Sequence, residues 1–342
     1  MPKVPDRMLA ARFHGPGDLR LDEVERPTPA AGWVVVEPVA VGICGTDAHI
    51  YAGEFPVRAP VTLGHEIAGR ISDIGDGIDD LAVGDPVSIE PHLFCTTCVY
   101  CRGGREHLCL NKQAFGVHLD GGMAEAVTVP RRTVYRVPEH IDLSVAALSE
   151  PLACSVHGFD RLAPRQGESM LIVGAGPAGL INTTLAAAIG SHPIVVVEPD
   201  PARRGLALEF GAEVVVDPTT DGWEAAAMAP TDGLGFASVI EAVGGASTLE
   251  AAVSLAARGA RILVFGVAPE SDVARIRPYE VFAKELTMLG TVINPYTQHR
   301  AVELLGRLPL DRLPIEAVPL TDVGAAFDGS LKGAIKVQIR PG

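Results

Sequence analysis

A glycine-rich turn between an apolar run and an alanine-rich segment constrains the fold of this chain more than any other feature. Gly174, Gly176 and Gly179 form the pattern G-x-G-x-x-G directly after Met170–Val173, an apolar run typical of a buried strand. In this pattern the first glycine permits a tight turn, the second lets the backbone approach a pyrophosphate, and the third allows close packing of helix on strand. The sequence therefore predicts a strand–turn–helix unit with a dinucleotide at the N-terminus of the helix.

Apolar runs alternate with helix-like segments from Glu150 onward. After the glycine-rich turn, the predicted strands are Ile194–Glu198, Glu213–Val216, Phe236–Val243, Arg261–Val267 and Leu286–Ile293. Such alternation implies a parallel sheet with right-handed crossovers, and therefore an α/β domain. The last of these strands either closes the sheet or begins the return to the first domain. That return is predicted to hold one helix, Gln298–Leu305, and a final strand, Ala334–Ile339.

The chain before Glu150 is rich in short β-branched runs separated by Gly, Pro and Asp. These runs are Trp33–Val41, Ile67–Gly75, Pro86–Glu90 and Met123–Val129. Their spacing favours a compact, largely antiparallel, barrel-like domain. With 342 residues, the chain is long enough for two domains that each have a core.

A carboxylate follows the glycine-rich turn at the spacing expected for a ribose ligand. Glu198 ends the second predicted strand, about twenty residues beyond the last glycine, where an acidic side chain accepts hydrogen bonds from an adenosine ribose. It would repel a 2′-phosphate, which favours NAD over NADP, although Arg203 and Arg204 lie close by. A plain βα turn with a surface glutamate is the alternative. The full set of predicted coenzyme contacts is Gly174, Gly176, Pro177, Ala178, Gly179, Glu198, Arg203, Val243 and Gly266.

Four of the six cysteines crowd into one short stretch, at Cys95, Cys98, Cys101 and Cys109. Four thiolates on one loop match a tetrahedral zinc site with no open position, which is structural rather than catalytic. Disulfides would need an oxidising compartment, which no other feature of the sequence indicates. An iron–sulfur cluster would imply redox partner chemistry for which the sequence has no other sign. The stretch therefore predicts a structural zinc ion.

Three residues from distant parts of the chain could hold a second metal ion. Cys44, His65 and Glu150 together would make a three-ligand zinc site with an open fourth position, and such a zinc lowers the pKa of a bound alcohol. Each residue alone has a plainer interpretation: a small buried cysteine, a hydrogen-bonded core histidine and a charge at a helix start. Because the same chain also carries a dinucleotide motif, a shared metal site is a stronger interpretation than three unrelated structural roles.

Five motifs together resemble one known family. They are Cys44-Gly45-Thr46-Asp47-x-His49, Gly64-His65-Glu66, the four-cysteine stretch, Glu150-Pro151-Leu152 and the G-x-G-x-x-G. The combination is similar to the zinc-containing medium-chain dehydrogenase/reductase family over essentially the whole chain. The resemblance implies a GroES-like, β-rich catalytic domain in residues 1–150 with a C-terminal return in 294–342. It also implies a Rossmann coenzyme domain, a doubly wound parallel sheet, in residues 151–293, and a cleft between the domains that holds the reactive zinc.

The resemblance further implies roles for individual residues. Thr46 would hydrogen-bond the reacting oxygen and His49 would pass the alcohol proton to solvent; their plainer interpretations are a helix N-cap and an exposed loop residue. Glu66 would lie beside the metal, either as a ligand or as a carboxylate that tunes the ligands. Glu150 stands where the ethanol-active branch has a cysteine. It is similar to the polyol branch, which includes sorbitol, galactitol-phosphate, arabitol-phosphate, butanediol and threonine dehydrogenases.

The sequence thus predicts an enzyme with two zinc ions per chain that transfers a hydride between NAD and a secondary alcohol or polyol. Three alternatives stay open: a threonine-type amino-alcohol dehydrogenase, a ketone reductase, and a family member without catalysis that only binds NAD.

Composition and charge narrow the expected partners. A net charge of -14 repels phosphate backbones, so a nucleic-acid partner is not expected. The opening residues carry no secretory signal and no apolar stretch is long enough to span a bilayer, so a cytoplasmic location without membrane contact is expected. The resemblance implies a homo-oligomer, with a tetramer favoured over a dimer.

Overall fold

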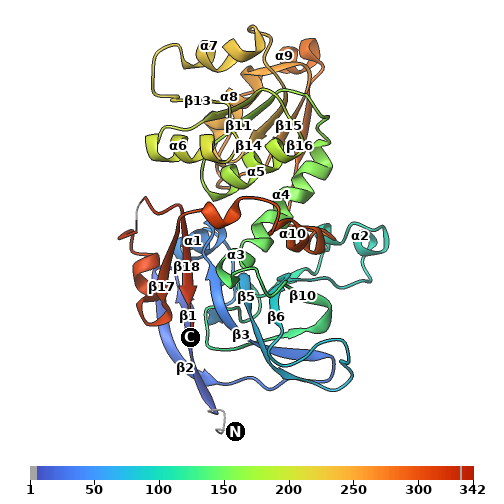
Figure 1. Ribbon diagram of the computed structural model, residues 1–342, viewed down its shortest axis with the longest axis vertical. Helices are drawn as coiled ribbons and strands as arrows, with labels where there is room; N and C mark the ends of the chain where they lie inside the picture. Colours follow the sequence, from blue (N-terminus) through green and yellow to red (C-terminus); the bar gives the residue numbers. More distant parts are fainter. Residues whose placement is uncertain (1–5, 332) are drawn as a thin grey trace. The chain divides into compact units, whose positions relative to one another are not determined.

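The computed structural model describes residues 6–331 and 333–342, which form two compact units (Figure 1). The first unit runs to Glu150 and resumes from Gln298 to Gly342, and the second unit spans Pro151–Thr297. The prediction that the chain lacks a secretory signal draws partly on residues 1–5, which lie outside the described residues. No helix in the described part of the chain is both long and apolar enough to cross a membrane.

The second unit is built on a six-stranded parallel sheet. Its strands are β11 (Met170–Val173), β12 (Ile194–Val197), β13 (Val214–Val216), β14 (Phe236–Glu241), β15 (Ala256–Val264) and β16 (Thr287–Gly290). They lie in the order β13-β12-β11-β14-β15-β16, so the direction of winding reverses between β11 and β14. This is the strand order of a Rossmann sheet, whose ligands bind outside the carboxyl ends of the strands at the reversal. The predicted α/β fold with a doubly wound sheet is confirmed.

Helices cover both faces of this sheet (Figure 1). They are α4 (Ser149–Leu162), which begins at the end of the first unit, α5 (Pro177–Ala188), α6 (Pro201–Glu209), α7 (Trp223–Met228), the 3₁₀ turn Ala229–Thr231, α8 (Ala246–Ser254) and α9 (Pro278–Lys284). Proline opens α5, α6 and α9, where its fixed φ suits the first turn and its missing N–H costs no hydrogen bond. Strands β11 and β12 are buried on both faces, which explains their unbroken apolar runs.

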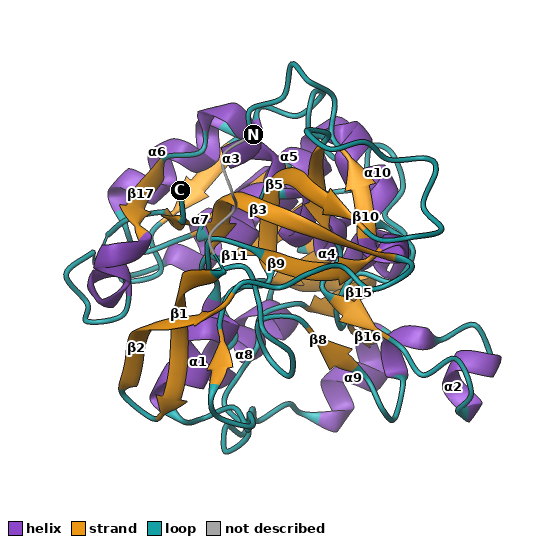
Figure 2. Ribbon diagram, turned by 90° about the horizontal axis from the view of Figure 1, so that it is seen from below, coloured by secondary structure: helices purple, strands orange, loops and turns teal. Residues whose placement is uncertain are grey.

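The first unit is mainly antiparallel β-structure (Figure 2). Its strands are β1 (Arg7–Gly15), β2 (Asp18–Glu25), β3 (Trp33–Gly42), β4 (Val61–Thr62), β5 (Glu66–Ile74), β6 (Pro86–Ile89), β7 (His92–Leu93), β8 (Gln113–Ala114), β9 (Val127–Pro130), β10 (Val134–Arg136), β17 (Ile315–Pro319) and β18 (Lys336–Arg340). The main sheet has the order β10-β6-β5-β3-β18-β17, with β9 also paired to β3. Because β18 pairs with β3, the end of the chain completes the sheet begun by its first third. The predicted β-rich, largely antiparallel fold is confirmed.

Short helices and 3₁₀ turns connect these strands. They are α1 (Gly45–Ala52), α2 (Val99–Arg102), α3 (Leu143–Ala146), α10 (Gln298–Leu304), and the turns Glu106–Leu108, Arg131–Thr133, Leu310–Arg312 and Leu320–Ala326. The apolar core of the unit lies between the sheets and includes Val36, Ile67 and Ile89, all nearly fully buried.

Several boundaries differ from the sequence prediction, and the strand predicted as Arg261–Val267 is β15, which spans Ala256–Val264. The strand predicted from Met123 begins only at Val127, because the residues before it form one isolated bridge to β1, Ala124 with Ala10, and no ladder. The strand predicted to reach Val243 ends at Glu241. The Glu241 carboxylate accepts a hydrogen bond from the Val243 N–H, so this N–H does not join the strand ladder. The second unit extends to Thr297, beyond the predicted boundary at 293, and Thr297 Oγ1 donates a hydrogen bond to Ala153 O in α4.

Candidate functional site

Cys44 and His65 lie at the end of β3 and the start of β5, two neighbouring strands of the first unit. The Cys44 thiol caps α1 by accepting a hydrogen bond from the backbone N–H of Thr46, and Asp47 accepts one from the Cys44 N–H in return. Helix α1 thus begins at Gly45 with Cys44 as its N-cap, so the N-cap interpretation of Thr46 is wrong. The Cys44 Sγ lies 3.0 Å from His65 Nε2.

A carboxylate completes a group of three potential ligands at this place. One ligand atom each from Cys44, His65 and Glu66 lies within 4.8 Å of the others. Thiolate, imidazole and carboxylate form a donor set that suits zinc. Gly64 and Gly42 allow the close approach: Gly64 has a φ of 92°, and a Cβ at Gly42 would lie 1.8 Å from Glu66 Oε2.

Asp47 lies behind His65 and orients it. Its carboxylate is fully buried and one oxygen lies 3.5 Å from His65 Nδ1, the nitrogen that faces away from Cys44. Burial alone would raise the pKa of Asp47, but the nearby charge of His65 and the hydrogen bond from the Cys44 N–H outweigh burial and hold that pKa below its usual value. A carboxylate behind a ligating histidine fixes the orientation of the ring and makes it a better ligand.

Glu66 forms a buried ion pair with Lys336 of β18. The Lys336 Nζ lies 2.7 Å from Glu66 Oε1 and donates a further hydrogen bond of 2.9 Å to Ile43 O. The two side chains are 2% and 1% exposed. Burial lowers the pKa of Lys336, but the charges of Glu66 and Cys44 outweigh it and raise that pKa above its usual value. Lys336 was not predicted from the sequence, because it lies in a strand 270 residues from its partner.

Glu150, the predicted third ligand, lies at the start of α4 and is buried. It does not belong to the compact group of Cys44, His65 and Glu66. Its charge acts on a second buried carboxyl, Glu90, which accepts a hydrogen bond of 3.0 Å from the Tyr135 hydroxyl. Burial raises the pKa of Glu90 to about 7, and the Glu150 charge adds to the rise.

The two predicted relay residues lie on α1. Thr46 is half-buried in the first turn of the helix, next to Cys44. The His49 Nδ1 lies 2.6 Å from the Glu54 carboxylate, and the histidine side chain is 28% exposed. His49 therefore reaches solvent and has an acidic partner, Glu54, that was not predicted from the sequence.

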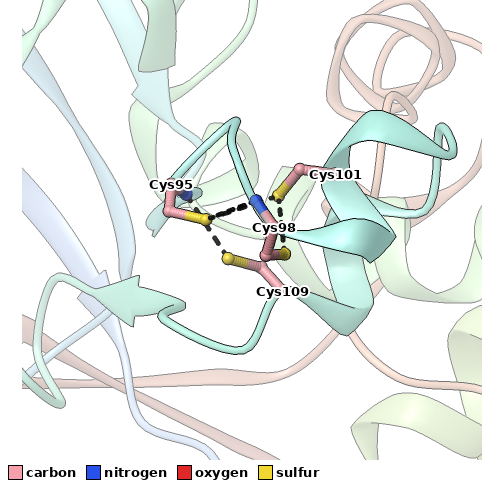
Figure 3. Close-up of side chains that lie close together, drawn as sticks. All are labelled: Cys95, Cys98, Cys101 and Cys109. Carbon is pink, nitrogen blue, oxygen red and sulfur yellow. Dashed lines mark hydrogen bonds between the residues drawn. The ribbon is translucent and has the colours of Figure 1, made fainter.

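The four clustered cysteines point toward one another (Figure 3). Their sulfurs lie within 4.8 Å of each other, and the measured pairs are Cys98–Cys101 at 3.5 Å and Cys95–Cys101 at 3.9 Å. Such separations exceed the ~2.05 Å of a disulfide, and all four thiols are unbonded. Hydrogen bonds from Thr97 lower the pKa of Cys95, and backbone N–H groups lower that of Cys98. A cradle of thiolates with amide donors fits a closed zinc site.

The glycine-rich turn of the second unit has the geometry that its pattern requires. Gly174 has a φ of 99°, and a Cβ at Gly179 would lie 2.0 Å from Gly174 O. A Cβ at Gly176 would meet nothing within 4 Å, so open space lies over the N-cap of α5. Pro177 and Ala178 form the first turn of that helix. The turn therefore fits a pyrophosphate at the helix N-terminus.

Glu198 follows β12 and its carboxylate bridges two loops. It accepts hydrogen bonds from the backbone N–H groups of Ala175, at 2.8 Å, and Asp200, at 3.0 Å. Arg203 lies in the first turn of α6, whose N-cap is Asp200, while Arg204 is bound to the carbonyls of Glu198 and Pro199. Glu198 thus braces the glycine-rich turn, a role that the spacing alone did not predict.

Comparisons with known proteins match both units. The family described as "Alcohol dehydrogenase GroES-like domain" matches residues 30–139, and "Zinc-binding dehydrogenase" matches residues 177–307. The chain is 36% identical over 292 residues to the L-threonine 3-dehydrogenase of Pyrococcus horikoshii, covering 84% of this chain and 83% of that protein. It is 30% identical over 341 residues to the sorbitol dehydrogenase of Halalkalibacterium halodurans, covering 98% and 99% of the two chains. Among solved structures, a zinc-binding dehydrogenase from Sinorhizobium meliloti 1021 bound to NADP has a TM-score of 0.95 at 34% identity, covering 98% of this chain and all of that one.

Proposed function

Because the chain belongs to the zinc-containing medium-chain dehydrogenase/reductase family, we propose that it oxidises a secondary alcohol or polyol and transfers the hydride to NAD. The observation that carries this proposal is the compact group of Cys44, His65 and Glu66 in a chain that also holds a glycine-rich dinucleotide turn. A zinc ion bound there would act as a Lewis acid toward the alcohol oxygen. The catalytically silent alternative would need a ligand or relay residue to be missing, and all are present.

The proposed zinc ligands are Cys44 and His65 with a carboxylate as the third. Glu150 is the candidate from the motif, and Glu66 is favoured by a carboxylate oxygen within 4.8 Å of the ligand atoms of Cys44 and His65. The negative charge of Glu66 is already paired with Lys336. A metal ion bound to Glu66 would therefore share that carboxylate with the lysine. Zinc content and affinity of the variants Glu66→Gln and Glu150→Gln separate the two: the variant of the true third ligand binds zinc more weakly.

The proposed proton path uses the polar side of α1. Thr46 would hydrogen-bond the alcohol oxygen, and His49 would accept the proton and release it to solvent. The contact of His49 Nδ1 with Glu54 supports this role, because it leaves Nε2 as the nitrogen that exchanges the proton. His49→Asn should reduce the rate at neutral pH and shift the rate profile toward higher pH.

NAD is the proposed coenzyme, since the Glu198 carboxylate at the end of β12 disfavours the added charge of a 2′-phosphate. The NADP held by the Sinorhizobium structure argues for NADP in a relative. The substitution Glu198→Ser should therefore shift the ratio of kcat/KM for NADP over NAD upward in this chain.

A threonine-type activity is the second candidate, favoured by the likeness to the Pyrococcus enzyme over most of both chains. The deciding experiment measures coenzyme reduction with sorbitol, xylitol, butane-2,3-diol and L-threonine, each with NAD and with NADP. Turnover of a polyol with NAD supports the main proposal, and turnover of threonine alone supports the second. Zinc-loaded protein that oxidises no alcohol would favour a binding role without catalysis.

The assembly and cellular setting belong to the same proposal. We expect a homo-oligomer, with a tetramer favoured over a dimer, and the edge strand β16 is one surface that could pair across a two-fold axis. Four unbonded thiols suit a reducing compartment such as the cytoplasm. Light scattering of the purified protein measures the assembly directly.

A further inference from the structure

The last residue of β14 is a buried glutamate that none of the roles above uses. Glu241 is 1% exposed and lies at the carboxyl end of the sheet, paired with Val173 of β11 and Val264 of β15. It therefore stands where the winding of the sheet reverses, beside the strand that leads into the glycine-rich turn. Ligands of Rossmann sheets bind outside this edge.

Glu241 fastens the loop that follows its own strand. Its Oε1 accepts hydrogen bonds from the backbone N–H groups of Val243 and Gly244, each at 2.9 Å, and from the Thr248 hydroxyl of α8 at 2.8 Å. One carboxylate oxygen thus holds two consecutive amides of the loop and the first turn of the next helix. Hydrogen bonds to a carboxylate are roughly twice as strong as those between neutral groups.

The backbone of the same residue fastens the next loop. The Glu241 carbonyl accepts hydrogen bonds of 2.9 Å from the N–H groups of both Phe265 and Gly266, which follow β15. Gly266 and Gly244 are in direct backbone contact, since a Cβ at Gly266 would lie 2.1 Å from Gly244 N. The loops after β14 and β15 are therefore locked to each other through one residue.

The locked loops also touch the glycine-rich turn. A Cβ at Gly174 would lie 2.7 Å from the Val243 side chain, so the loop after β14 packs directly on the first glycine of the motif. Val243 itself stays 54% exposed at this edge, although its backbone N–H is tied down by Glu241. A buried carboxylate thus holds an exposed apolar side chain in a fixed place beside the dinucleotide turn.

We propose that Glu241, with Thr248, is a positioning residue that sets the loops after β14 and β15 in the conformation that receives the nicotinamide coenzyme. The inference rests on the proposed use of a nicotinamide coenzyme by the second unit. The Glu241 carboxylate acts through the amides of Val243 and Gly244 and through the Thr248 hydroxyl, while its backbone carbonyl holds the Gly266 amide. A loop that holds its binding conformation in advance binds more tightly, because the apparent Kd rises in inverse proportion to the populated fraction of that conformation.

The test compares Glu241→Ala, Thr248→Val and Thr248→Ser in the full-length, zinc-loaded protein. Coenzyme affinity is measured by fluorescence titration with NADH and NADPH, and the melting temperature is recorded for each variant. Loss of the carboxylate should raise the Kd about tenfold or more, and loss of the hydroxyl about two- to fivefold, while serine restores the wild-type value. The rate at saturating coenzyme should change much less than the Kd.

The matched control is Glu168→Gln at the opposite, amino-terminal edge of the same sheet. Glu168 precedes β11 and pairs with Arg261 of β15, whereas the loops follow the carboxyl ends of β14 and β15. This control should lower the melting temperature without changing the Kd. If Glu241→Ala does not fold, the Thr248 pair decides alone.

Three outcomes are distinguishable. A raised Kd in Glu241→Ala and Thr248→Val, with the control unchanged, supports the positioning role. Wild-type affinity in folded Glu241→Ala, or in Thr248→Val, overturns it while the proposed function stands. A wild-type protein that binds neither NADH nor NADPH overturns both the positioning role and the proposed function.

Discussion

The substitution Lys336→Met removes the ammonium group that neutralises the Glu66 carboxylate. Both side chains are buried, at 2% and 1% exposed, so the substitution leaves a buried carboxylate without its partner. In the native chain the Lys336 ammonium has three acceptor contacts within 2.9 Å, two to Glu66 and one to Ile43 O. Breaking a buried pair by removing one partner destabilises a protein by about 3–5 kcal/mol, because the remaining charge stays buried without compensation. We therefore expect Lys336→Met to lower the free energy of unfolding of the first unit by about that amount.

The double substitution Glu66→Gln with Lys336→Met separates charge from packing. Replacing both members of a buried pair with well-packed apolar groups is often close to neutral, and the double variant likewise leaves no buried charge, although the glutamine keeps a polar amide. The double variant should therefore recover most of the loss, with a coupling free energy above about 2 kcal/mol in a double-mutant cycle. Urea denaturation followed by far-ultraviolet circular dichroism gives the four free energies, measured without added zinc so that no metal ion beside Cys44 and His65 compensates the Glu66 charge.

Two results would refute this reasoning. A loss below about 1 kcal/mol in Lys336→Met would place the pair in the range of exposed ion pairs, against its burial. A double variant whose loss equals the sum of the single losses would show that the two residues do not interact.

Three further substitutions test other features. Burial holds the pKa of Glu90 at about 7 against 4.5 for a free glutamate, so its proton favours the folded state and stability falls as pH rises from about 4.5 through 7. Glu90→Gln should therefore be more stable than wild type at pH 8, by at most about 3 kcal/mol, with no advantage at pH 4; equal melting curves at pH 8 would contradict this. Cys98→Ser should leave one zinc ion per chain and make the stretch between Cys95 and Cys109 sensitive to limited proteolysis, whereas unchanged zinc content by plasma mass spectrometry would exclude a structural ion there. Gly179→Ala places a methyl group 2.0 Å from Gly174 O, so NADH binding should fall at least tenfold, and unchanged affinity would show that the turn does not carry the coenzyme.

Local patterns predicted the fold because each signal lies within a few residues. The strand at Met170–Val173 and the helix start at Pro177 follow from an apolar run, a glycine turn and a proline whose meanings are set by neighbours in the chain. The hairpin of β1 and β2 was not predicted, because half of β2 is exposed and its charged residues hide the alternation. Charged and exposed residues also interrupt the apolar pattern at the ends of strands, so the predicted ends were less accurate than the predicted centres.

In the candidate site, too, residues with a local sequence signal were predicted, and residues whose partners are distant in the sequence were not. Cys44, His65 and the four clustered cysteines were found because metal ligands come in recognisable residue types and spacings. Lys336 and Glu241 were not found, since their roles depend on partners that only the folded sheet brings within reach. The glutamate at 241 ends an apolar strand, and a charge in that position is the one signal that could have directed attention to it.

The most direct test is an anomalous difference map recorded at the zinc absorption edge from crystals of the full chain. Two peaks per chain are expected, one enclosed by the four clustered sulfurs at ~2.3 Å and one bound by Cys44 Sγ, His65 Nε2 and a carboxylate oxygen. The absence of a peak between Cys44 and His65 in zinc-loaded, active protein would contradict the proposed chemistry, even with the fold intact.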